Sequence, residues 1–143
     1  MERRAFVRKC GMGCLGILSS SLLLPGCAGT RYVSGNIQGS FLSISEDDFL
    51  NEDHDYLKHV VVQNDALQYP IVVFRLGTDN YQALLMKCTH QGTELQVFGD
   101  RLQCPAHGSE FTITGNVQNG PADSALRSFP VIKEFKTLKI DLS

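Results

Sequence analysis

The 143-residue sequence has no tryptophan, only two of its five cysteines after residue 27, and no basic excess, since its formal net charge is −2. The lack of a basic excess argues against a nucleic-acid partner, because nucleic-acid-binding proteins normally carry a positive surface. The length leaves no room for a two-domain enzyme. No sustained apolar period of about 3.6 residues occurs beyond residue 27, which argues against a helical bundle. These exclusions leave one small domain that follows a short leader.

The leader is basic and the rest of the chain is acidic. Residues 1–27 hold four of the 13 basic residues and one of the 15 acidic residues, so nine basic and 14 acidic residues remain in the body. A basic start, an apolar stretch over residues 10–24 and a Pro-Gly-Cys ending are typical of an export signal. This stretch is shorter than the about 20 residues that a membrane-spanning helix needs. We therefore predict an export signal at residues 1–27 and one domain at residues 28–143.

Two short patterns refine the prediction for the leader. Arg3 and Arg4, followed by Ala-Phe-Val-Arg, resemble the twin-arginine motif of bacterial export signals, a route that carries folded proteins. The Leu-Pro-Gly-Cys sequence that ends at Cys27 resembles a lipobox, which implies lipidation of Cys27. The alternatives are an ordinary secretory signal and an uncleaved anchor. We predict a bacterial protein exported across the inner membrane and held on its periplasmic side, as a lipoprotein.

The body has the pattern of an all-β protein. Apolar or alternating runs separated by turn residues predict strands over residues 41–44, 57–62, 71–76, 81–88, 94–98, 101–104, 110–114 and 129–142. Six acidic residues between positions 46 and 55 predict a solvated acidic loop. His54 and His59 are expected at the surface. We predict a small antiparallel β-sandwich whose functional residues lie in the loops between strands.

The two cysteines of the body each lie close to a histidine. Cys88 is followed by His90, and Cys104 by His107, so each segment offers one thiolate and one imidazole. A single zinc ion is usually held by pairs of like residues within one loop. Two loops that each mix sulfur and nitrogen suit a two-iron cluster better, with both cysteines on one iron and both histidines on the other. A structural zinc site built from the same four residues is the alternative.

Residues 88–92 (Cys-Thr-His-Gln-Gly) and 104–109 (Cys-Pro-Ala-His-Gly-Ser), with Gly-Pro-Ala at 120–122, resemble the Rieske [2Fe–2S] family. The resemblance is sharp over residues 84–131. It implies one [2Fe–2S] cluster per chain, in a Rieske-type antiparallel β-sandwich with a small cluster-binding subdomain of two loops and a proline loop. The ligands that it implies are Cys88, His90, Cys104 and His107. The other cluster-binding residues that it implies are Gly92, Gly108, Ser109 and Pro121.

The sequence keeps some features of the family and departs from others. Gly92 and Gly108 can adopt positive φ, which would let backbone N–H groups approach the bridging sulfides. In the high-potential members each loop carries an extra cysteine and the two form a disulfide, but Thr93 and Ala106 stand at these positions here. A tyrosine that donates to a cysteine ligand is replaced by Phe111. The lost donor disfavours the reduced cluster, so we expect an intermediate potential, below that of the quinol-oxidising members.

The resemblance implies an electron carrier with no bond chemistry of its own. We predict a membrane-tethered subunit or partner of an extracytoplasmic respiratory oxidoreductase. Its redox partner would be a cytochrome or a larger oxidoreductase subunit, and the N-terminal lipid or anchor would hold it to the membrane. The alternatives are the ferredoxin component of an oxygenase-type system, against which the export signal argues, and a structural zinc-binding lipoprotein.

Overall fold

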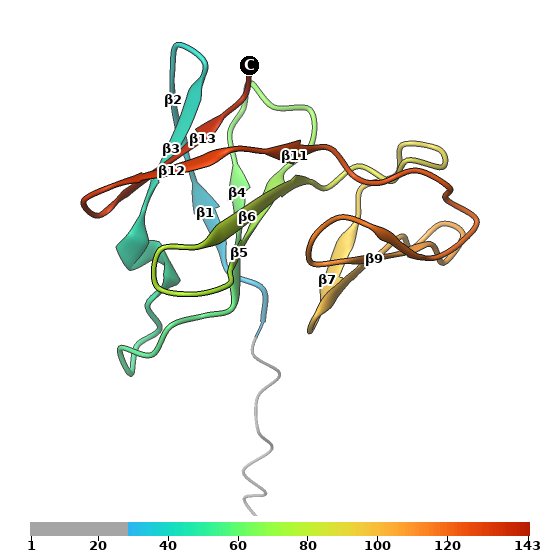
Figure 1. Cartoon of the computed structure of the whole chain (residues 1–143), viewed down its shortest axis with the longest axis horizontal. Helices are drawn as coiled ribbons and strands as arrows, with labels where there is room; N and C mark the ends of the chain where they lie inside the picture. The colour runs from blue at the N-terminus through green and yellow to red at the C-terminus, as the bar shows by residue number, and fades with distance from the viewer. Residues whose placement is uncertain (1–28) are drawn as a thin grey trace, which may run out of the picture.

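Three β-sheets form the part of the chain that the computed structural model describes, residues 29–143 (Figure 1). The predicted export signal and Cys27 lie outside these residues. No helix in the described range is long and apolar enough to cross a bilayer. The first strands are β1 (Tyr32–Ser34), β2 (Asn36–Gln38), β3 (Phe41–Ser45), β4 (His59–Gln63), β5 (Ile71–Arg75) and β6 (Tyr81–Leu85). The remaining strands are β7 (Gln96–Phe98), β8 (Arg101–Gln103), β9 (Glu110–Thr112), β10 (Val117–Asn119), β11 (Ser128–Phe129), β12 (Val131–Glu134) and β13 (Thr137–Asp141).

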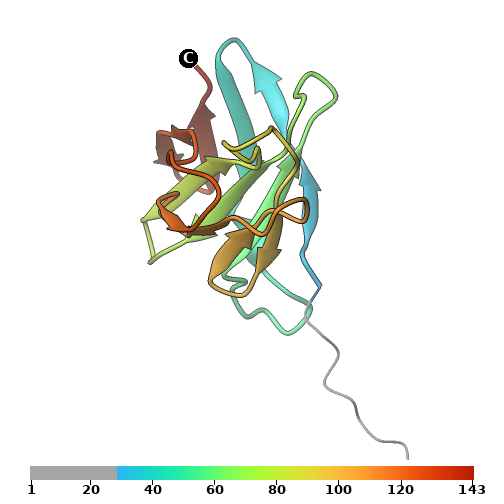
Figure 2. The same cartoon turned by 90° about the vertical axis from the view of Figure 1, so that its right-hand side faces the viewer.

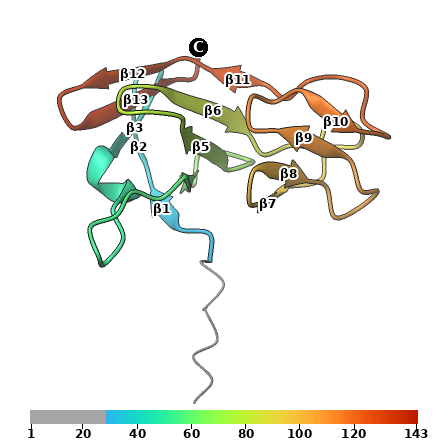
Figure 3. The ribbon, with the colours of Figure 1, turned by 60° about the horizontal axis from the view of Figure 1, so that its bottom comes forward.

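The strand order places two sheets in a base and one in a separate subdomain. The base consists of a sheet ordered β1-β4-β5-β6-β11 and a sheet ordered β12-β13-β3-β2. The third sheet, ordered β10-β9-β8-β7, forms the subdomain to one side of the base (Figures 1 and 3). The predicted all-β fold with antiparallel sheets is confirmed. One pairing differs, because β1 runs parallel to β4.

The parallel pairing follows from the way the chain passes between the two base sheets. β1 belongs to the first sheet and β2 to the second, and Gly35 alone separates them. A Cβ atom on Gly35 would lie 2.5 Å from Leu42 Cδ1 and 2.7 Å from Val62 Cγ1. Since both neighbours are buried, only a glycine fits at this crossing without moving the core.

The five-stranded sheet of the base, β1-β4-β5-β6-β11, is buried on both of its faces. Each face contributes to a different hydrophobic core. Alternation along β4 sends Val60 and Val62 to the core between the base sheets, and Val61 to the core under the subdomain. Because both faces are buried, β4 and β5 contain uninterrupted apolar runs, at residues 60–62 and 71–74. The core under the subdomain also contains both cysteines of the body, Cys88 and Cys104. The sheet therefore supports the thiols directly.

The sequence had predicted a solvated acidic loop at residues 46–55. The structure corrects this prediction, because part of the segment is buried. It begins with a 3₁₀ helix, η1 (Glu46–Phe49), which a capping box starts. Phe49 is buried in the base core, and Glu46 is only 9% exposed. The Glu46 carboxylate accepts hydrogen bonds from Lys133 Nζ at 2.8 Å and from the Tyr81 hydroxyl at 3.0 Å. This lysine lies 87 residues away, so a local count of acidic residues could not reveal the pairing.

His59 is also less exposed than the sequence suggested. It begins β4 and its ring lies 5.6 Å from that of Phe74, centroid to centroid. Its Nε2 atom is buried without a hydrogen-bond partner. Burial lowers the pKa of His59, because the charged imidazolium would lose its hydration. Burial therefore favours the neutral form of this ring in the folded protein.

These two side chains predict that acid weakens the fold in two steps. The pKa of folded His59 lies below its ordinary value of 6.5, so the unfolded chain takes up a proton first as the pH falls through 6.5. The free energy of unfolding then decreases. The Lys133 hydrogen bond lowers the pKa of Glu46 from 4.5, although burial opposes it. Stability is therefore lost again as the pH falls below 4.5, until folded Glu46 is protonated.

The His59→Gln variant isolates the first of these steps. We expect its urea unfolding midpoint to fall less between pH 7.5 and 5.5 than that of the wild type. The exposed His54 provides the control, since His54→Gln should keep the wild-type pH dependence. An unchanged pH dependence in His59→Gln would show that another group governs the first step.

Candidate metal centre

Three loops meet at the end of the subdomain that faces away from the β12–β13 hairpin (Figure 1). The first loop, residues 88–93, lies between β6 and β7, and the second, residues 104–109, between β8 and β9. The third, residues 120–126, lies between β10 and β11 and contains the Gly-Pro-Ala segment. Figure 2 looks onto this end. Every predicted cluster residue in the described chain lies in one of these three loops.

The first two loops close in the same way. In the first, the Gly92 N–H donates to the Cys88 carbonyl at 2.8 Å, and the Cys88 N–H donates to the Thr93 carbonyl at 2.8 Å. In the second, the Gly108 N–H donates to the Cys104 carbonyl at 3.0 Å, and the Cys104 N–H to the Ser109 carbonyl at 2.8 Å. Each loop therefore spans the same number of residues from its cysteine to its last hydrogen bond.

The two loop glycines have the positive φ that the sequence predicted. Gly92 has φ 77° and Gly108 has φ 78°, values that favour glycine over other residues. The N–H groups of these two glycines donate to the cysteine carbonyls and close the loops. The approach of other backbone N–H groups to bridging sulfides stays a prediction. The glycines thus fix the loop shape from within.

The four predicted ligands divide by burial. Cys88 is 1% exposed and Cys104 is 2% exposed, and both belong to the core under the subdomain. His90 and His107 are exposed, and their ring centroids are 5.1 Å apart with the ring planes nearly perpendicular, at 88°. Within residues 29–143 no three His, Cys, Asp or Glu side chains gather as they would around one metal ion. The site therefore has an inner pair of thiols and an outer pair of imidazoles.

The surroundings of Cys104 favour its thiolate, which is the form that binds metals. Burial alone would raise the pKa of the Cys104 thiol. Hydrogen bonds from the Ala106 and His107 backbone and from the Cys88 and Thr93 side chains outweigh that effect and lower the pKa. Thr93 occupies the same position after Cys88 as Ser109 does after Cys104, so the loop repeat is the signal that would have indicated its role.

Ser109 joins the second loop to the proline loop. Its side chain is fully buried, and its Oγ accepts a hydrogen bond from the Ala122 N–H at 3.0 Å. The hydroxyl proton remains available for donation. Pro121, which precedes Ala122, is exposed and follows a cis peptide bond. The proline loop is therefore held from its buried side.

Two further hydrogen bonds to the first loop were not anticipated from the sequence. Thr89 Oγ1 donates to the Ser124 carbonyl of the proline loop at 2.7 Å. The Tyr69 hydroxyl, from the segment between β4 and β5, donates to the Gly92 carbonyl at 2.7 Å. Tyr69 and Gly92 are 23 residues apart. No local pattern indicates such a bond, because it depends on how the base and the subdomain pack.

The Tyr69→Phe variant tests whether this bond restrains the first loop. Losing one hydrogen bond should cost about 0.5–1.5 kcal/mol, so we expect the cluster to be released about two- to tenfold faster on mild heating. Loss of visible absorbance measures the release. Tyr32, which is 56% exposed, provides the control, since Tyr32→Phe should release at the wild-type rate. Equal rates in all three proteins would mean that Tyr69 does not restrain the loop.

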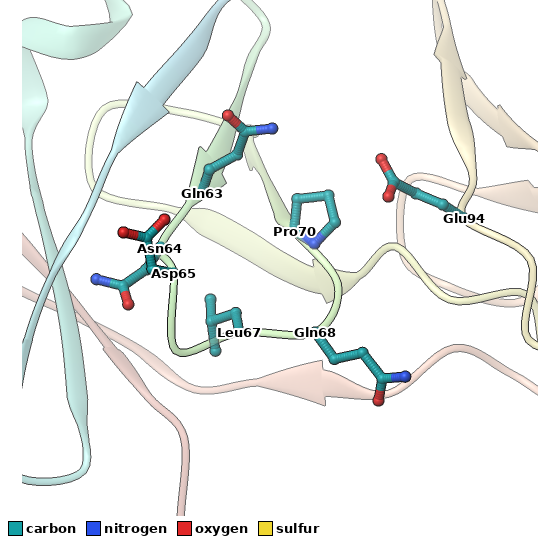
Figure 4. A pocket seen from close by; sticks show the side chains of 7 residues that line it. All are labelled: Gln63, Asn64, Asp65, Leu67, Gln68, Pro70 and Glu94. Carbon is teal, nitrogen blue, oxygen red and sulfur yellow. The ribbon is translucent and has the colours of Figure 1, made fainter.

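Away from the three loops, a hollow of about 410 Å³ lies between the β4–β5 connection and Glu94 (Figure 4). Its ionisable side chains are Asp65 and Glu94, both exposed. Asn64 in its wall donates to the Gly35 carbonyl at 2.9 Å and accepts from the Ala66 N–H at 2.8 Å. This hollow contains none of the predicted cluster residues, and its asparagine has a structural role.

Comparison with known proteins identifies the family. The sequence model of the Rieske [2Fe–2S] domain matches residues 48–130, more than half of the chain. The chain belongs to the Rieske [2Fe–2S] family. The matched range includes all three loops. A Rieske domain binds a [2Fe–2S] cluster and transfers electrons, so the alternative of a structural zinc site is set aside.

Solved structures share the fold. The Rieske protein PetC3 of the plasma membrane of Synechocystis PCC 6803 is 24% identical, with a TM-score of 0.51 over 59% of this chain and 86% of that one. A chain from the oxygenase–ferredoxin complex of carbazole 1,9a-dioxygenase is 22% identical, with a TM-score of 0.55 over 73% of this chain and 95% of that one. The quaternary ammonium Rieske monooxygenase CntA is 17% identical, with a TM-score of 0.56 over 73% of this chain and 33% of that one. A comparison with curated proteins finds no match.

The donor set fits the Rieske cluster. Two thiols and two imidazoles are the donors that such a cluster takes, with the histidines on one iron. Here the Cys88 thiol donates a hydrogen bond to Cys104 within the core, and the two imidazole rings lie 5.1 Å apart at the surface. The hydrogen bonds that lower the pKa of Cys104 favour the thiolate form that a ligand needs.

Proposed function

We propose that Cys88 and Cys104 bind one iron of the cluster and that His90 and His107 bind the other. The observation that carries this assignment is the separation of buried thiols from exposed imidazoles at one end of the molecule. The bound cluster supplies a site that accepts and releases one electron. The buried thiols keep one side of it from water, and the exposed histidines present the other side to a partner. Electrons therefore pass through the histidine end.

The chain itself has residues for holding and tuning a cluster rather than for bond chemistry. Phe111 is fully buried in the same core as the two cysteines, so it excludes water but donates no hydrogen bond. The buried hydroxyl of Ser109, at the end of the second loop, can donate a hydrogen bond towards the cluster. We propose a carrier of intermediate potential that passes electrons to a cytochrome or to a larger oxidoreductase subunit.

Purification of the full chain tests this function. We expect about two irons and two acid-labile sulfides per chain, a rhombic electron paramagnetic resonance signal on reduction, and a reversible one-electron titration. Stoichiometric zinc without iron would overturn the assignment. A cluster that could not be reoxidised would argue against a carrier.

We further propose that this carrier is exported and held at the periplasmic face of the membrane by a lipid on Cys27. The leader sequence supports this proposal. Replacement of Arg3 and Arg4 by lysine should leave the protein inside the cell. Cys27→Ser should release the protein from the membrane fraction or block its processing, while Cys14→Ser, in the same leader, should do neither. A wild-type protein found soluble in the cytoplasm would favour the alternative, the ferredoxin component of an oxygenase-type system.

A further inference from the structure

A hollow of about 470 Å³ lies directly beside His90. Its wall includes Cys88 and Gly92 from the first loop and Ser124 from the proline loop. Two cationic side chains complete it, Lys87 just before the first loop and Arg127 just after the proline loop. Both are exposed. The hollow is therefore lined by His90, a proposed iron ligand, and by two positively charged side chains.

Neither cation is neutralised by a carboxylate within the described residues. The five ion pairs of residues 29–143 use other basic side chains. Lys87 Nζ lies 5.3 Å from the centroid of the Tyr69 ring. The Arg127 guanidinium lies 4.8 Å from the Phe129 ring centroid, and its Nη2 donates to the Leu142 carbonyl at 3.3 Å. Aromatic faces and a carbonyl hold the two side chains in place and leave their charges available.

The rest of the domain has the opposite charge. The chain beyond residue 27 has 14 acidic residues against nine basic ones, and six of the acidic residues lie at positions 46–55, in the base. Near the hollow, the acidic residues are Asp123 in the proline loop and Glu94, whose backbone pairs with that of Lys87. Neither forms an ion pair with Lys87 or Arg127. The lining of the hollow thus holds two cations and no carboxylate, on an otherwise acidic domain.

We propose that this hollow receives carboxylate side chains from an acidic surface of the redox partner protein. This inference rests on the proposed electron-transfer function. An acidic partner is repelled by most of the domain and attracted to Lys87 and Arg127, so it approaches with His90 facing it. Charge complementarity thereby selects the orientation in which the distance to the cluster is shortest.

Electron transfer to two forms of one acceptor tests the proposal. The reduced full-length protein is mixed with ferricytochrome c, either native and basic or with its lysines succinylated and therefore acidic. The double variant Lys87→Gln/Arg127→Gln is compared with Lys58→Gln/Lys136→Gln, which removes the same net charge. Lys58 and Lys136 are exposed and do not line the hollow. The potential of each protein is measured first, so that rates can be compared at equal driving force.

We expect Lys87→Gln/Arg127→Gln to slow transfer to the succinylated acceptor about three- to tenfold at low ionic strength, relative to the control double variant. Transfer to the native acceptor should not slow. Equal rates in the two double variants would overturn the proposal, because net charge alone would explain the effect. Equal slowing with both acceptors would also overturn it, since the effect of the two cations would then not depend on the charge of the partner. A wild type that holds no cluster would instead refute the proposed function.

Discussion

Replacing Cys88 or Cys104 by serine should yield a chain without iron. Serine is a poor ligand for the soft iron–sulfide unit, and the remaining three ligands cannot hold both irons. Both positions are almost fully buried, so the substitution also places a hydroxyl in an apolar core. We expect iron and sulfide to fall from about two per chain to near zero, with loss of the rhombic resonance.

The histidine ligands have a matched control within the chain. His90→Gln and His107→Gln should lose the cluster, whereas His54→Gln, at an exposed residue outside the three loops, should keep it. Iron and sulfide analysis of the three variants gives the answer directly. If Cys88→Ser retained two irons with an unchanged resonance, the proposed ligand set would be wrong.

Ser109→Ala should lower the reduction potential of the cluster and weaken the second loop. Reduction adds negative charge to the cluster, so a hydroxyl that donates towards it stabilises the reduced state. Loss of a donor worth about 1–2 kcal/mol lowers a one-electron potential by about 40–90 mV. The same change leaves the Ala122 N–H without its partner, so the thermal unfolding temperature should fall as well.

Protein-film voltammetry and a thermal scan separate the two effects of this substitution. Ser124→Ala, which removes an exposed hydroxyl from the proline loop, should change neither the potential nor the unfolding temperature. An unchanged potential in Ser109→Ala, together with a lower unfolding temperature, would mean that Ser109 holds the proline loop but does not reach the cluster.

The sequence predicted those features that depend on neighbouring residues. The runs that became β4, β5 and β6 are strongly apolar or alternate, so their strands could be recognised. The Cys-x-His and Cys-x-x-His segments predicted the first two loops, and the Gly-Pro-Ala segment, through the family resemblance, predicted the third. β10 was missed, because Val117–Asn119 is short and mostly polar and becomes a strand only by pairing with β9.

Features that join distant segments could not be predicted in this way. The Glu46–Lys133 ion pair, the Tyr69–Gly92 hydrogen bond and the parallel pairing of β1 with β4 all depend on how the sheets pack. The same holds for His59, whose burial comes from its neighbours on the adjacent strand. A single polar residue is therefore predicted from the sequence to be exposed, whether or not the fold buries it.

The division of the interior into two cores predicts that the two halves of the domain depend differently on the cofactor. The core between the base sheets contains none of the proposed ligands, so it can form while the chain still lacks its cofactor. The other core includes both thiols, so a bound cluster should stabilise this core and the loops that close over it. Removal of the cofactor should therefore loosen the cluster-binding loops before it affects the base.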